Sequence, residues 1–128
     1  MGYKEIYNSW KNDPESFWMT AADAIDWVKK PSKALFSERA PLYEWFCDSE
    51  VNTCYNAVDR HVLNGRADQK AIIYDSPMTD TKYSITFSEL LEKVATLAGA
   101  LNSKGISKGD RVIIYMPMVP EGIIAMLA

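Results

Sequence analysis

The chain of 128 residues has little of what nucleic-acid and metal sites require, with one histidine, two cysteines and a formal net charge of -3. A nucleic acid or an anionic membrane surface calls for lysine and arginine clustered on one face, and the acidic balance argues against both partners. The densest basic group is formed by Lys29, Lys30 and Lys33, and aspartates precede it. We interpret this group as a solvated surface.

The scarcity of cysteine and histidine also limits metal chemistry. A structural zinc site needs about four ligands, and Cys47, Cys54 and His61 together fall short of that number. We expect the two cysteines to be buried or half-buried thiols without a disulfide. We expect His61 to lie near a helix C-terminus, where the helix dipole favours the protonated ring, and not to be catalytic.

Long hydrophobic runs are missing as well. The apolar stretch over residues 112–128 is interrupted by Pro117, Pro120, Glu121 and Gly122, and it is shorter than the ~20 residues that a bilayer requires. The first residues contain no apolar core of the signal-peptide type. These features predict no membrane segment and a cytoplasmic location.

What the chain does contain is typical of a folded domain, since 48% of its residues are hydrophobic and 12% are aromatic. Asp13-Pro14-Glu15 predicts a helix start, because Asp13 can cap free amides and Pro14 suits the first helical position. We expect this helix to run to about Val28. A second helix should begin at Glu50 or Asn52 and end at Asn64-Gly65 with a left-handed cap.

Between these helices, residues 32–50 show no sustained periodicity but carry several large apolar side chains. Ordering such a segment costs about 1 to 2 kcal/mol per residue, so its rings must pack against a neighbouring body. Trp45 and Phe46 are the candidate anchors. We expect ordinary packing of these rings in preference to stacking on a ligand.

The second half of the chain predicts a β-β-α-β-α order. Residues 71–74 and 83–86 should form a hairpin, and Thr86 with Glu89 forms a capping box that opens a helix closing at Gly105. Residues 112–115 are apolar at successive positions, which indicates a strand buried on both faces of an α/β sheet. Pro120 should open a further helix. Because this strand has no second parallel strand after it, we expect the chain to be a fragment.

No chemical motif emerges from this pattern. Residues 104–109 lack the spacing of a phosphate-binding loop and precede a strand, so they are interpreted as a helix cap and a turn. Asp59, Asp110 and Glu121 lie near the predicted ends of elements, where capping or dipole effects explain them. We therefore assign no catalytic, cofactor-binding or metal-binding residue within the chain.

Three stretches together resemble one family. Trp45-Phe46-Cys47 followed by residues 52–61 is similar to the signature near the start of short-chain acyl-CoA synthetases, the acetyl- and propionyl-CoA synthetase group of AMP-forming ligases. Residues 109–121, running on to Ala128, resemble the first core strand and helix of that family, and the helix start at residues 86–90 lies between the two. The amino-acid sequence of the first of these stretches looks closer to that of propionyl- than to that of acetyl-CoA synthetases.

The resemblance implies an incomplete N-terminal part of the large domain of an acyl-adenylate-forming enzyme, with a helical arm over residues 1–66 and the start of the AMP-binding α/β domain over residues 67–128. The parent would use ATP, Mg²⁺ and coenzyme A to join propionate or acetate to the coenzyme through an acyl-adenylate. In the family those ligand contacts lie beyond Ala128, so the chain alone should be inactive. Its partners would be the remainder of the large domain and, through exposed apolar surface, a second copy. The alternative is a self-contained, non-catalytic α/β interaction module.

Overall fold

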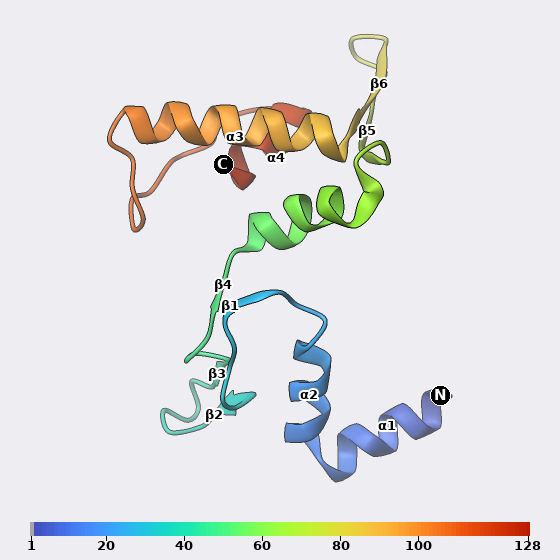
Figure 1. Ribbon diagram of the computed structural model, residues 1–128, viewed down its shortest axis with the longest axis vertical. Helices are drawn as coiled ribbons and strands as arrows, with labels where there is room; N and C mark the ends of the chain where they lie inside the picture. The colour runs from blue at the N-terminus through green and yellow to red at the C-terminus, as the bar shows by residue number, and fades with distance from the viewer. Residues whose placement is uncertain (1) are drawn as a thin grey trace. The chain divides into compact units, whose positions relative to one another are not determined.

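The computed structural model describes residues 2–128, which divide into two compact units at the junction between Asn52 and Thr53 (Figure 1). The first unit contains α1 (Tyr3–Asn12), α2 (Pro14–Ala22) and four short strands. These strands are β1 (Trp27–Lys29), β2 (Leu35–Phe36), β3 (Glu44–Trp45) and β4 (Glu50–Val51). They form two antiparallel pairs, β1 with β4 and β2 with β3.

The start of α2 confirms the predicted cap, because the Asp13 side chain accepts a hydrogen bond from the Ser16 amide at 3.0 Å. The predicted end at Val28 was wrong, since α2 stops at Ala22. The following amides bond three residues back and tighten the last turn, and the indole N–H of Trp27 donates to the Ala22 carbonyl at 2.7 Å. Pairing of β1 with β4 then supplies the backbone partners that a longer helix would have supplied.

The second unit opens with helical residues 53–66, which include two π-helical turns, η1 (Tyr55–Asp59) and η2 (Val62–Arg66). Gly65 has a φ of 79°, as the predicted left-handed cap requires. A hairpin of β5 (Lys70–Ser76) and β6 (Thr81–Thr86) follows, then α3 (Phe87–Ser103) and α4 (Pro120–Leu127). The hairpin, the capping box of Thr86 with Glu89, and the helix start at Pro120 are all confirmed.

The core of the second unit is small and made of aliphatic side chains. Helix α3 contributes Leu90 and Val94, which pack with Ile85 of β6. Val58 of η1 and Ile124 of α4 complete the buried cluster. Burial of these side chains supplies the hydrophobic free energy that holds helices and hairpin together.

The predicted buried strand at residues 112–115 was wrong. Residues 111–117 form no helix or strand, and Ile113 and Tyr115 are 92% and 100% exposed. A strand exists only when a neighbour accepts and donates its backbone hydrogen bonds, and every strand within residues 2–128 is already in a two-stranded antiparallel pair. The described residues therefore form a mixed α/β arrangement of helices and small hairpins, without a parallel sheet.

Within residues 2–128, none of the helices combines the length and the apolar character needed to cross a membrane.

Candidate functional site

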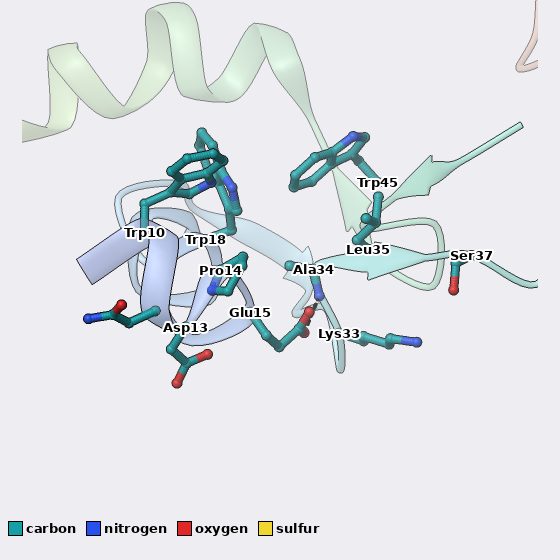
Figure 2. A pocket seen from close by; sticks show the side chains of 11 residues that line it. Trp10, Asp13, Pro14, Glu15, Trp18, Lys33, Ala34, Leu35, Ser37 and Trp45 are labelled. Carbon is teal, nitrogen blue, oxygen red and sulfur yellow. Dashed lines mark hydrogen bonds between the residues drawn. The ribbon is translucent and has the colours of Figure 1, made fainter. Parts of the chain in front are cut away.

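The first unit contains a pocket of about 580 Å³, which lies between α1, α2 and the segment that carries β2 and β3 (Figure 2). Three indole rings dominate its wall, and we call it the tryptophan pocket. Its lining consists of Trp10, Asn12, Asp13, Pro14, Glu15, Trp18, Lys33, Ala34, Leu35, Ser37 and Trp45. The volume falls within the range of small-molecule sites, which makes this pocket the first candidate for a functional role.

Local sequence explains how the rings come together. Trp10 lies near the end of α1, and Trp18 lies on α2, which the Asp13-Pro14 junction separates from α1. Trp45 belongs to β3, and its ring meets the Trp18 ring edge-on with centroids 5.5 Å apart. Edge-to-face packing of this kind is favourable for aromatic pairs.

The predicted anchors of the arm thus both contact rings of their own unit, since the Phe46 and Trp27 centroids are 5.6 Å apart. The arm also gains order from a backbone contact, in which the Ala34 amide donates to Glu15 Oε1 at 2.6 Å. Ala34 is buried beneath this contact. The packing of the rings accounts for the order of the segment without a ligand.

The charged groups at the rim of the tryptophan pocket already have partners. Hydrogen bonds from Ser16, the backbone amide first, lower the pKa of the Asp13 carboxyl. The Lys33 Nζ lies 3.5 Å from a Glu38 oxygen and 5.4 Å from the centroid of the Phe36 ring. An acid-base pair needs two groups placed across a cleft with separated pKa values, and this lining does not provide one. The pocket is suited to holding an apolar group by packing.

No pattern in the sequence predicted this pocket as a site. Trp10, Lys33 and Ser37 carry no motif, and the two helices that bring Trp10 toward Trp18 are joined by a turn whose geometry no local pattern specifies. The only usable signal was the spacing of the tryptophans themselves, all four of which fall in the first 45 residues.

For the two cysteines one expectation is confirmed and one is corrected, whereas the structure adds a contact for the histidine. Both cysteines are free thiols, as expected. Cys47, however, is exposed, whereas Cys54 is half-buried with its pKa raised by desolvation and by Asp59. The Nδ1 atom of His61 lies 3.1 Å from the Nη1 atom of Arg66. The expectation of a protonated ring at this position stays a prediction.

Two features bear on whether phosphate groups or Mg²⁺ fit the described residues. At residues 104–106 the three amides donate to carbonyls of the last turn of α3, so this loop is a helix cap with no free amides directed at an anion. Asp110 closes the next turn by accepting from the Ser107 amide at 2.7 Å. No group of three or more His, Cys, Asp or Glu side chains able to hold a metal occurs within residues 2–128. The loop at residues 104–110 is therefore a helix cap followed by a turn.

Comparison with known proteins identifies the chain by family. A family model described as "Acetyl-coenzyme A synthetase N-terminus" matches residues 3–57, and a model described as "AMP-binding enzyme" matches residues 59–128. The chain belongs to the AMP-binding enzyme family, within which it corresponds to the N-terminal portion of short-chain acyl-CoA synthetases. The domain boundary predicted between residues 66 and 67 stays a prediction.

Individual relatives agree with this assignment. The chain is 50% identical over 126 residues to acyl-CoA synthetase short-chain family member 3, mitochondrial, of Bos taurus, a match that covers 98% of this chain and 18% of the relative. It is 42% identical over 127 residues to acetyl-coenzyme A synthetase of Paraburkholderia phymatum, covering 98% of this chain and 19% of that protein. The chain thus spans less than a fifth of the length of these relatives.

Among solved structures, acetoacetyl-CoA synthetase from Streptomyces lividans superposes with a TM-score of 0.81 at 26% sequence identity. The match covers 99% of this chain and 20% of that structure. The helices and small hairpins described above are therefore an arrangement that a synthetase of this family also contains.

Proposed function

We propose that this chain is the N-terminal structural segment of an AMP-forming ligase that joins a short carboxylic acid, propionate or acetate, to coenzyme A. The main observation that supports this proposal is that two consecutive family models together match nearly every residue of the chain. The 50% identity to the bovine relative extends over almost the whole chain. In the longer protein the carboxylate would attack ATP to give an acyl-adenylate and pyrophosphate, and the coenzyme A thiol would then displace AMP.

The role of this segment in that reaction is scaffolding. The charged groups around the tryptophan pocket are engaged in caps and ion pairs, and the loop at residues 104–109 caps α3. Positioning and electrostatic stabilisation supply most of the rate in reactions of this type, and both require groups aimed at the reacting atoms. We therefore propose that residues 1–128 alone do not turn over substrate.

A chimera tests this proposal directly. Residues 1–128 replace the aligned part of the bovine relative, and acyl-CoA formation is measured with propionate, acetate and butyrate. We expect the chimera to be active, with kcat/KM higher for propionate than for acetate, while residues 1–128 alone release no pyrophosphate above background. The intact bovine protein serves as the control for folding and assay.

Two results would contradict the proposal. Pyrophosphate release by residues 1–128 alone would show that the chain holds its own catalytic groups. A folded chimera with no ligase activity, beside an active bovine control, would favour the alternative of a non-catalytic interaction module.

A cytoplasmic location also remains a proposal from the N-terminal sequence. The bovine relative has "mitochondrial" in its name, so a fluorescent fusion of the whole protein, imaged against a mitochondrial marker, distinguishes the two compartments.

A further inference from the structure

We draw no further inference here: the strongest candidate, the tryptophan pocket between α1, α2 and the segment that carries β2 and β3, is an apolar hollow in a chain that spans less than a fifth of the length of its relatives, and nothing in the structure shows what covers it.

Discussion

Replacing Leu90 with alanine tests whether the small aliphatic cluster holds the second unit together. Leu90 is only 4% exposed and packs with Val58, Ile85 and Ile124, which come from three other elements. A buried Leu→Ala change costs about 2 to 5 kcal/mol through lost transfer free energy and the cavity left behind. A unit of this size is stabilised by only about 4 to 11 kcal/mol, so L90A removes a large share of its stability.

The measurement is urea unfolding followed by far-UV circular dichroism, at about 2 µM so that association contributes nothing. With a slope of about 1 to 1.5 kcal/mol per molar urea, a loss of about 2 to 5 kcal/mol lowers the midpoint by about 1.3 to 5 M. Alanine is at least as good a helix former as leucine, so the loss cannot come from helix propensity in α3. The matched control is I113A, which truncates a 92% exposed side chain and should change stability by less than about 0.5 kcal/mol. Equal midpoints for L90A and I113A would refute this account of the core.

Three further predictions concern α3 and use the same unfolding assay. T86A removes the hydroxyl that accepts a hydrogen bond from the Glu89 amide at 3.2 Å, and it should cost about 0.5 to 2 kcal/mol of stability. The control T96A lies on the exposed face of α3 and should cost less than about 0.5 kcal/mol. An equal loss in both variants would contradict the capping role of Thr86. G105A places a side chain at a φ of 87° and should destabilise the protein by about 1 to 2 kcal/mol. G99A lies within α3, where an added Cβ meets nothing within 4 Å, and it should stabilise the protein by about 0.5 to 1 kcal/mol. A stability change of the same sign in both variants would count against the left-handed cap at Gly105. Hydrogen bonds from Thr86, the backbone amide first, lower the pKa of Glu89, so the stabilisation is complete above pH 4.5 and is lost as the pH falls through the folded-state pKa. Urea midpoints between pH 6 and pH 3 should fall less for E89Q, which keeps the capping box without a titrating group; identical pH profiles would exclude this contribution.

The sequence predicted those elements whose signals are local. The capping box of Thr86 with Glu89 fixes the start of α3 within a span of four residues, and glycine at 65 supplies the positive φ that the end of a helix needs. The hairpin of β5 and β6 could be predicted because both strands are close in sequence. Errors arose where the partner is distant, as at β1, whose residues are paired with β4 more than twenty positions later.

The same distinction between local signals and distant partners applies to the candidate site. The importance of Trp45 and Phe46 as anchors could be predicted, because large rings in an irregular segment must be covered. Their partners Trp18 and Trp27 could not, since which rings meet depends on the angle between helices and on where the chain returns. The orientation of His61 was missed for the same reason, because Arg66 reaches its ring only in the folded turn.

By itself the sequence determined the family, the capped ends of α2 and α3 and the β5-β6 hairpin, because each depends on residue identities at short, fixed spacing. Only the tertiary structure decided that Val112 to Tyr115 remain unpaired and that three tryptophans enclose a pocket. The physical reason is that a strand or an aromatic cluster gains its free energy from partners elsewhere in space, whereas a helix cap gains it from its own neighbours.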